Sequence, residues 1–294
     1  MGNLDTTYGL TDFSLFNRIV NCVLCSSQFH KIEYENEVGI QILPRSQLHL
    51  IIFGEFGISK SAILNEICRE RSVTPTIQLT KAVIVGSFDK NTSSFTPPLV
   101  WQRNGNIIAI DEFSYDPDSK GQKGVLDTLL SLMENMPYSK TLLGRIPNMK
   151  KKIAKNGGSI SIKDSLMTCD PRFSLIATTM NHPLNYSSYR MHAFFSRAIV
   201  LHYKPTMEDL KGILNKKRKL YSYENFFKVN EILIQKKDFD FIQNFVEKRE
   251  IPISLYLRTI GDCMRFFAVL QEHDEDIYNF VVSSKIAYHI EGGK

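Results

Sequence analysis

The sequence predicts an α/β fold in which a parallel sheet, covered by helices on both faces, is followed by a small helical domain. Apolar segments with the length of buried strands occur at 48–53, 76–85 in part, 106–110, 173–179 and 198–203, and helix-like stretches separate most of them. After Lys204-Pro205 the periodicity is helical, over 207–220, 223–233, 237–249, 253–271 and 276–289. A glycine-containing loop that leads from the first strand into a helix is the third observation.

These patterns divide the chain into three parts. Residues 12–29 place apolar side chains at helical spacing, so we expect residues 1–47 to form an N-terminal helical extension. Residues 48–205 contain the predicted strands and form an α/β domain. Residues 206–294 form a helical domain that packs on it.

The composition is that of a globular protein without a membrane segment. Hydrophobic residues make up 43% and charged residues 23% of the 294 positions. The longest apolar runs have about six residues, whereas about 20 are needed to span a bilayer. Residues 1–6 lack the basic and apolar regions of a signal peptide, and five cysteines, an odd number, suit a reducing compartment. We therefore expect a cytoplasmic protein without a membrane partner.

The loop after the first strand has the residues of a phosphate-binding loop, and it reads Gly54-Glu55-Phe56-Gly57-Ile58-Ser59-Lys60-Ser61. In such a loop the backbone N–H groups, here around Gly54, Gly57 and Ser59, and the positive end of the helix face the anion. Lys60 is expected to reach the β and γ oxygens, and the Ser61 hydroxyl to hold Mg²⁺. ATP with Mg²⁺ is the predicted ligand, although Ser59 replaces the usual glycine.

A pair of carboxylates follows the apolar strand at 106–110. The residues are Asp111-Glu112-Phe113. In P-loop ATPases two such carboxylates divide the work, so we expect Asp111 to hold Mg²⁺ and Glu112 to orient the attacking water. Taken singly, the loop is also typical of a glycine turn, and the carboxylates of an acidic helix cap. Together, in this order and spacing, they favour an ATPase.

Two further strand ends carry polar residues. The strand at 173–179 is followed by Asn181, whose amide we expect beside the γ-phosphate, where it helps to position the water. Arg197 precedes the strand at 198–203 and points away from its own nucleotide. It is useful only beside the ATP of a neighbouring subunit. The sequence therefore predicts a ring-shaped homo-oligomer.

One segment predicts a hairpin that projects from the core, and a second segment is strongly basic. Residues 83–100 read as two β-like arms around a polar tip that contains Lys90. Residues 140–172 contain eight basic and only two acidic residues, and Lys152 and Lys155 are among the basic ones. Such a positive patch favours a polyanion such as nucleic acid. The plain alternative is that these lysines solvate a long loop.

In order along the chain, these motifs resemble those of the AAA+ module of the MCM replicative helicases. The loop is similar to the family's GDPGxAKS, with Glu55, Phe56 and Ser59 as departures, and Ile110-Asp111-Glu112-Phe113 reproduces its IDEF. The remaining similarities are Asn181-His182-Pro183 to the sensor-1 asparagine and its proline, Ser196-Arg197 to the arginine finger, Arg258-Thr259-Ile260 with Arg265 to the sensor-2 pattern, 83–100 to the helix-2 insert, and 153–157 to the tip of the presensor-1 hairpin.

The resemblance implies a P-loop AAA+ fold, with a parallel five-stranded sheet sandwiched by helices, β-hairpin insertions and a C-terminal helical lid. It implies an ATP-hydrolysing hexamer, in which Arg197 and Arg258 come from the adjacent subunit. It also implies that the chain translocates on or unwinds DNA through basic residues of the hairpins, Lys90, Lys152 and Lys155. A DNA-associated location in the nucleoid and partners among replication proteins follow from it.

Residues 1–47 have neither the length nor the cysteines for the family's N-terminal OB-fold and zinc region. Two other functions therefore stay open. The chain can be an ATP- and DNA-binding accessory, loader or decoy for a full-length helicase, with little hydrolysis of its own. It can also be a MoxR-like protein-remodelling ATPase, since such relatives share the same insertions.

Overall fold

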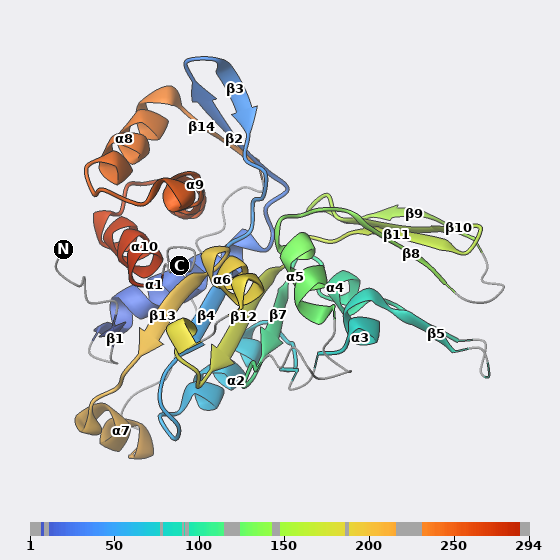
Figure 1. Cartoon of the computed structure of the whole chain (residues 1–294), viewed down its shortest axis with the longest axis horizontal. Coiled ribbons are helices and arrows are strands. Elements are labelled where there is room, and N and C mark those ends of the chain that lie inside the picture. The colour runs from blue at the N-terminus through green and yellow to red at the C-terminus, as the bar shows by residue number, and fades with distance from the viewer. Residues whose placement is uncertain are drawn as a thin grey trace.

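The computed structural model confirms an α/β fold built on a parallel sheet (Figure 1). It describes residues 7–8, 12–76, 79–89, 91, 94–114, 124–142, 148–185, 188–215 and 231–288. The sheet has the order β1-β13-β4-β12-β7, and every neighbouring pair is parallel. The strands are β1 (Thr7–Tyr8), β4 (Leu50–Phe53), β7 (Ile107–Ile110), β12 (Ser174–Thr179) and β13 (Ile199–Tyr203). The strands expected at 48–53, 106–110, 173–179 and 198–203 are thus confirmed.

The expected strand within 76–85 is mostly wrong. Thr76 makes a single parallel bridge to Ile110, and α3 (Lys81–Val85) follows as a helix. Thr80 explains the helix, because its side chain accepts a hydrogen bond from the backbone N–H of Val83 and so satisfies a donor of the first turn. Gly86, with a φ of 78°, then ends the helix.

Strand residues alternate between two apolar cores, one on each face of the sheet. In β4, Leu50 and Ile52 belong to the first core, and Ile51 and Phe53 to the second. The first core contains side chains of α1 (Phe13–Ser26), α2 (Lys60–Glu70), α9 (Ile253–Leu270) and α10 (Glu275–Ala287). The second contains side chains of α3, α5 (Val125–Met133) and α6 (Tyr189–Ser196). Helices on both faces explain why residues on both faces of the central strands are buried.

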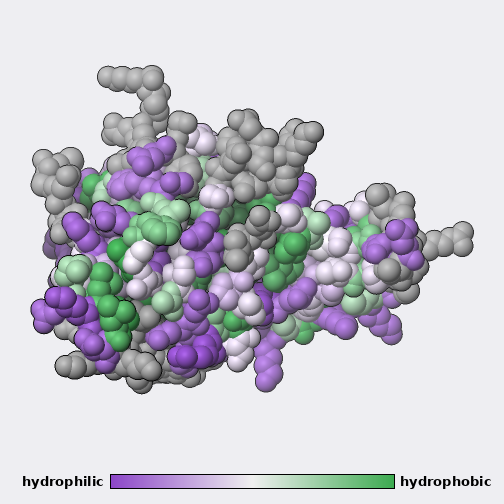
Figure 2. All heavy atoms as spheres, turned by 90° about the horizontal axis from the view of Figure 1, so that it is seen from below, coloured by the Kyte–Doolittle hydropathy of each residue, from purple (hydrophilic) through white to green (hydrophobic). Residues whose placement is uncertain are grey.

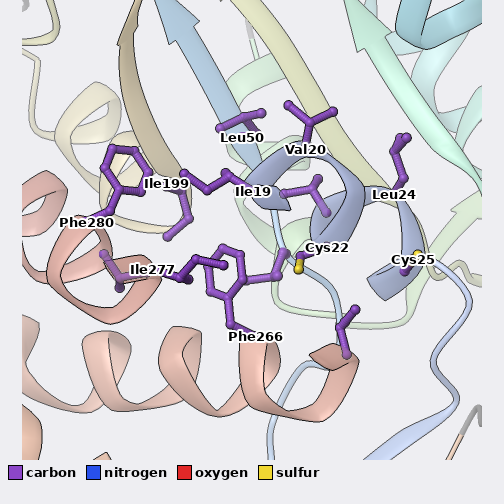
Figure 3. Close-up of a cluster of buried hydrophobic side chains, with 14 of the residues drawn as sticks. Ile19, Val20, Cys22, Leu24, Cys25, Leu50, Ile199, Phe266, Ile277 and Phe280 are labelled. Atoms are coloured by element: carbon purple, nitrogen blue, oxygen red, sulfur yellow. The ribbon is translucent and has the colours of Figure 1, made fainter. Parts of the chain in front are cut away.

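The N-terminal extension is joined to the C-terminal helices rather than set apart from them. Figure 3 shows Ile19 and Cys22 of α1 beside Phe266 of α9 and Ile277 of α10. After α1 the chain forms a hairpin of β2 (Lys31–Asn36) and β3 (Gly39–Ile42). The extension is therefore not wholly helical. A strand from the C-terminal part, β14 (Glu231–Ile234), pairs with β2 in parallel, so that the small sheet has the order β14-β2-β3.

Where the structure describes the C-terminal part, at 206–215 and 231–288, its other regular elements are helices. Its helices are α7 (Met207–Leu214), α8 (Lys236–Glu247), α9 and α10. The helix expected over 223–233 is wrong at 231–233, and the rest of that range lies outside the described residues. The run Ile232-Leu233-Ile234 explains the strand, because β-branched residues suit an edge that pairs with β2.

Two insertions project from the β7 side of the sheet, toward the right in Figure 1. The first is the hairpin of β5 (Ser87–Asp89) and β6 (Ser94–Thr96), which confirms the two arms expected within 83–100; α4 (Leu99–Gln102) follows it. The second is an antiparallel sheet with the order β8-β11-β10-β9. Its strands are β8 (Tyr138–Thr141), β9 (Met149–Ile153), β10 (Ser159–Lys163) and β11 (Leu166–Asp170).

A buried cluster of charged residues connects the C-terminal helices to the core. The Asp262 carboxylate on α9 pairs with Arg45 at 3.1 Å, with Arg265 at 2.7 Å and with Lys285 of α10 at 2.8 Å. The Lys285 ammonium also donates to the carbonyls of Ser196 and Ala198, which lie before β13. Burial alone raises the pKa of Asp262, but the three cations outweigh it, so the pKa lies well below its ordinary value.

No helix in the described part of the chain is long and apolar enough to cross a membrane. Figure 2 views the molecule from the side toward which the parallel strands end, and hydrophilic and hydrophobic residues are interspersed over the visible face.

Candidate functional site

In the loop between β4 and α2, two positions of the backbone favour glycine. A Cβ atom on Gly54 would lie 2.5 Å from the carbonyl oxygen of Tyr203, at the end of β13, so no side chain fits there. Gly57 has a φ of 79°, in the left-handed region, and no atom lies within 4 Å of the place of its Cβ. Ser59 is also left-handed, with a φ of 69°, and its side chain does not cap the helix. The loop is therefore fixed at its start and open above Gly57.

Lys60, the first residue of α2, has a buried ammonium without a carboxylate partner among the described residues. Its side chain is 7% exposed, and Nζ donates to the carbonyls of Gly54, at 2.7 Å, and Glu55. Burial lowers the pKa of Lys60, while the charges of Glu112 and Asp111 partly oppose the shift. An anion bound in the loop would raise the pKa of Lys60 again, because it would favour the charged ammonium.

The two sequence motifs meet at Asp111. Its Oδ1 accepts a hydrogen bond from the Ser61 hydroxyl at 3.0 Å and from the Thr178 hydroxyl at 2.7 Å. Thr178 Oγ1 in turn accepts from the backbone N–H of Glu112 at 3.0 Å. The start of α2 and the ends of β7 and β12 are therefore connected through one carboxylate oxygen. The sequence motifs do not include Thr178. Its position near the end of an apolar strand is the one feature of the sequence that could have indicated it.

Glu112 and Asn181 lie at this same edge of the sheet. Glu112 has a φ of 52°, which is uncommon for a residue with a side chain, and its side chain is exposed. Backbone strain of this kind concentrates at functional sites. Asn181 is exposed just beyond β12, and its backbone N–H donates to Thr179 Oγ1 at 3.3 Å. Thr179 also accepts, through its carbonyl, from the N–H of Gly54, so Asn181 follows the strand end beside the loop.

The residues at this edge fit a triphosphate with Mg²⁺. Phosphate oxygens need backbone N–H groups at a helix start and a cation, and Lys60 with the loop at Gly57 supplies both. Mg²⁺ prefers hard oxygen ligands, and the Ser61 hydroxyl and the Asp111 carboxylate already lie within hydrogen-bond distance of each other. Across the described residues no group of three or more His, Cys, Asp or Glu side chains could hold a metal ion. A nucleotide-bound Mg²⁺ does not need such a group of side chains, because it takes most of its ligands from phosphates and water.

Arg197 and Arg258 lie together at the opposite edge of the sheet. Arg197 precedes β13, whose first residue Ile199 pairs with Leu50, the first residue of β4, whereas the loop follows the end of β4. Arg197 Nε lies 2.7 Å from Glu134 Oε1, and Arg258 Nη2 lies 3.9 Å from the same oxygen. The structure therefore separates both arginines from the loop that carries Lys60.

Of the three predicted DNA-binding lysines, the structure describes Lys152 and Lys155. Lys90 lies outside the described residues. Lys152 is exposed on β9, next to the exposed Lys150 and Lys151. Lys155 is exposed in the turn between β9 and β10.

Residues 153–157 lie at the turn of a hairpin, between β9 and β10, but this turn packs on the core of the protein. Asn156, in the turn between β9 and β10, is 5% exposed. Its side chain accepts from Asn104 Nδ2 at 2.7 Å and donates to the carbonyl of Arg172 at 3.1 Å. Because residues 104 and 172 precede β7 and β12, this turn packs on the core, and the turn at Asp164 and Ser165 lies at the other end of the inserted sheet.

Comparisons with known proteins add no relatives to this description. No protein-family model matches the chain, and a search of curated proteins found no match. Arguments about function therefore rest on the residues and their geometry.

Proposed function

We propose that the chain is an ATP-hydrolysing AAA+ motor that assembles as a ring and moves along DNA, like the AAA+ module of the MCM helicases that its motifs resemble. The observation that carries the proposal is the meeting of Lys60, Ser61, Asp111 and Glu112 at the carboxyl edge of a parallel sheet. Ligands of open α/β sheets bind at this edge. The strand order β13-β4-β12-β7, extended by the bridge of Thr76 to Ile110, supports assignment to the five-stranded P-loop arrangement.

Each residue has a role that its position supports. Lys60 neutralises the charge of the β and γ oxygens, and the N–H groups at Gly57 to Ser61 bind the phosphates. Ser61 and Asp111 would hold Mg²⁺, which neutralises charge that develops on the phosphate oxygens. Glu112 orients the attacking water and accepts its proton, helped by Asn181. Thr178 is a positioning residue, because it holds both Asp111 Oδ1 and the backbone of Glu112.

Replacing Glu112 with glutamine is expected to leave ATP binding intact and to slow hydrolysis by about 100-fold or more, because the amide cannot accept the proton of the water. Phosphate release and the affinity for a fluorescent ATP analogue measure the two effects separately. Glu55→Gln is the matched control, since Glu55 is exposed in the same region and only its carbonyl contacts Lys60. Equal phosphate release by Glu112→Gln and Glu55→Gln would contradict the role of Glu112.

The place of the two arginines supports action between subunits. Arg197 and Arg258 share Glu134 at the edge away from their own loop, so a neighbouring subunit must bring its triphosphate to them. Such a guanidinium stabilises the charge of the transferred phosphoryl group. A closed ring gives every subunit one such neighbour.

Mixing Arg197→Ala subunits with Lys60→Ala subunits is expected to restore part of the ATPase activity that each variant lacks alone. In the mixture some interfaces combine an intact loop from one subunit with an intact Arg197 from the next. Phosphate release measured across mixing ratios tests this expectation, with Arg190→Ala in place of Arg197→Ala as an exposed control. Activity that never exceeds the sum of the separate variants at any ratio would argue against a finger in trans.

The inserted sheet is the proposed DNA contact, since Lys150, Lys151 and Lys152 stand exposed on its edge strand β9. Lysines on an edge strand also prevent pairing with other strands, which is their plain structural role. Salt dependence distinguishes the two roles, because each lysine that contacts a phosphate releases counterions when DNA binds.

Replacing Lys152 with glutamate is expected to weaken binding of single-stranded DNA and to lower the slope of log affinity against log salt by roughly 1. Binding is measured by fluorescence anisotropy across a salt series. Lys236→Glu, on the exposed start of α8, is the charge-matched control. An unchanged slope in Lys152→Glu would favour a protein-remodelling ATPase, and DNA binding without ATP turnover would favour an accessory factor.

A further inference from the structure

A cavity of about 410 Å³ lies between the β2–β3 hairpin, α8 and α9, away from the loop that carries Lys60. Its wall is largely aromatic and aliphatic, and the ring of Tyr34 stacks on that of Phe239 with centroids 5.1 Å apart. The volume is that of a pocket for a small ligand. Other apolar side chains that line it are Leu43, Tyr256, Ile260 and Met264.

The charged residues that line the cavity are mostly cationic. Arg45, Arg258 and Arg265 face a single carboxylate, Glu134. Glu134 is already shared by Arg258 and Arg197. Asp262, behind the wall, is likewise shared by Arg45, Arg265 and Lys285. In the ion pairs of these described residues, five cations therefore share two carboxylates, and positive charge is left uncompensated beside the cavity.

Arg45 is the residue that points to a ligand. Its side chain is 3% exposed, and Nη2 donates to Asp262 at 3.1 Å. Nη1 is buried and has no hydrogen-bond partner within the described part of the chain. A buried guanidinium N–H without a partner is costly, and buried charges normally pair. An anionic group in the cavity would supply the missing acceptor.

We propose that this cavity binds a small organic anion with an aromatic or branched apolar body. The anionic group, a carboxylate, sulfonate or phosphate, lies against Arg45, and the apolar body lies between Tyr34 and Tyr256. The charge of the ligand offsets the excess of arginines, and its body fills the apolar part of the wall. The inference does not depend on the proposed ATPase activity, because the loop at Lys60 lies at the opposite edge of the sheet.

Anilinonaphthalene sulfonate, an aromatic anion that fluoresces when it leaves water, is the probe. It is expected to bind with a saturable stoichiometry of one per chain. Phenylnaphthylamine, which has a similar aromatic body without the sulfonate, is expected to bind about 10-fold more weakly, since it makes no charge-assisted hydrogen bond with Arg45. Added ATP is expected to leave the probe bound.

Two variants test the assignment, and one serves as the control. Arg45→Met removes the guanidinium but leaves Asp262 paired with Arg265 and Lys285. Gly261→Leu fills the cavity from α9 and favours the helix, and its Cβ would lie 3.2 Å from Nη1 of Arg265, the atom that pairs with Asp262. Arg190→Met removes an exposed arginine whose partner is the exposed Asp127.

Both cavity variants are expected to bind the sulfonate at least about 10-fold more weakly, while Arg190→Met binds it as the unaltered protein does. Arg45→Met is expected to leave phenylnaphthylamine binding unchanged, and Gly261→Leu to weaken it. Circular dichroism shows whether each variant is folded. If Arg45→Met is unfolded, Gly261→Leu alone tests the proposal. Sulfonate binding that is equal in all folded proteins, that ATP displaces, or that the neutral probe matches would overturn the proposal.

Discussion

Lys60→Ala is expected to abolish measurable ATP hydrolysis, with a loss of at least about 100-fold to 1,000-fold, the effect typical of removing one preorganised charge donor. The ammonium is buried at the start of α2 and has no carboxylate partner among the described residues, so in the proposed site the phosphates of ATP would supply its counter-charge. Without the Lys60 ammonium, less positive charge would offset the repulsion between the bound phosphates and the carboxylates of Asp111 and Glu112.

Phosphate release and titration with a fluorescent ATP analogue measure this loss. Lys204→Ala is the control, because Lys204 is exposed just after β13. A circular dichroism melt shows that each variant is folded. ATP affinity and turnover that are the same in Lys60→Ala and Lys204→Ala would remove the basis for the phosphate-binding loop.

Asp262→Ala is expected to lower the free energy of unfolding by about 3–5 kcal/mol, as the loss of one partner of a buried ion pair does. The alanine would leave Arg45, Arg265 and Lys285 buried without their shared carboxylate. The effect is a large part of the total stability of about 5–15 kcal/mol that is usual for a folded protein. Because these residues join α9 and α10 to the core, the helical part would lose its polar contacts with the core and keep only the apolar ones.

Urea unfolding measures the loss, and Asp127→Ala, which removes an exposed partner of Arg190, is the control with an expected effect below about 1 kcal/mol. The pKa of Asp262 is lower in the folded protein than in the unfolded chain, so its contribution is present at neutral pH. The contribution falls as the pH drops below about 4, the ordinary value for aspartate. Equal midpoints for Asp262→Ala and Asp127→Ala would contradict this account.

The sequence was sufficient to predict the buried strands and the edge at which the candidate site lies. Strands β4, β7, β12 and β13 are buried on both faces and mostly apolar, so they can be recognised in the sequence as nearly continuous apolar runs. Parallel strands end at one edge, so motifs that follow β4, β7 and β12 must come close together. The contact of Ser61 with Asp111 is the result of this rule.

Other features depend on contacts between distant segments and could not be predicted from local patterns. β14 is a strand because β2, some 200 residues earlier, offers an edge, and the pairs run from Glu231 with Lys31 to Ile234 with Tyr34. The turn that contains Lys155 looks like any polar tip in sequence, and only the contacts of Asn156 with residues 104 and 172 place it on the core. The role of Glu134, which lies in no motif, appears only when Arg197 and Arg258 come together.

The most direct test of the central claim is an experimental structure of the protein with Mg²⁺ and a non-hydrolysable ATP analogue. The account predicts the β and γ phosphates over residues 57–61 with Lys60 beside them, Mg²⁺ at Ser61 and Asp111, and the γ-phosphate next to Glu112. A nucleotide bound elsewhere, or a loop that stays empty at saturating analogue, would contradict it.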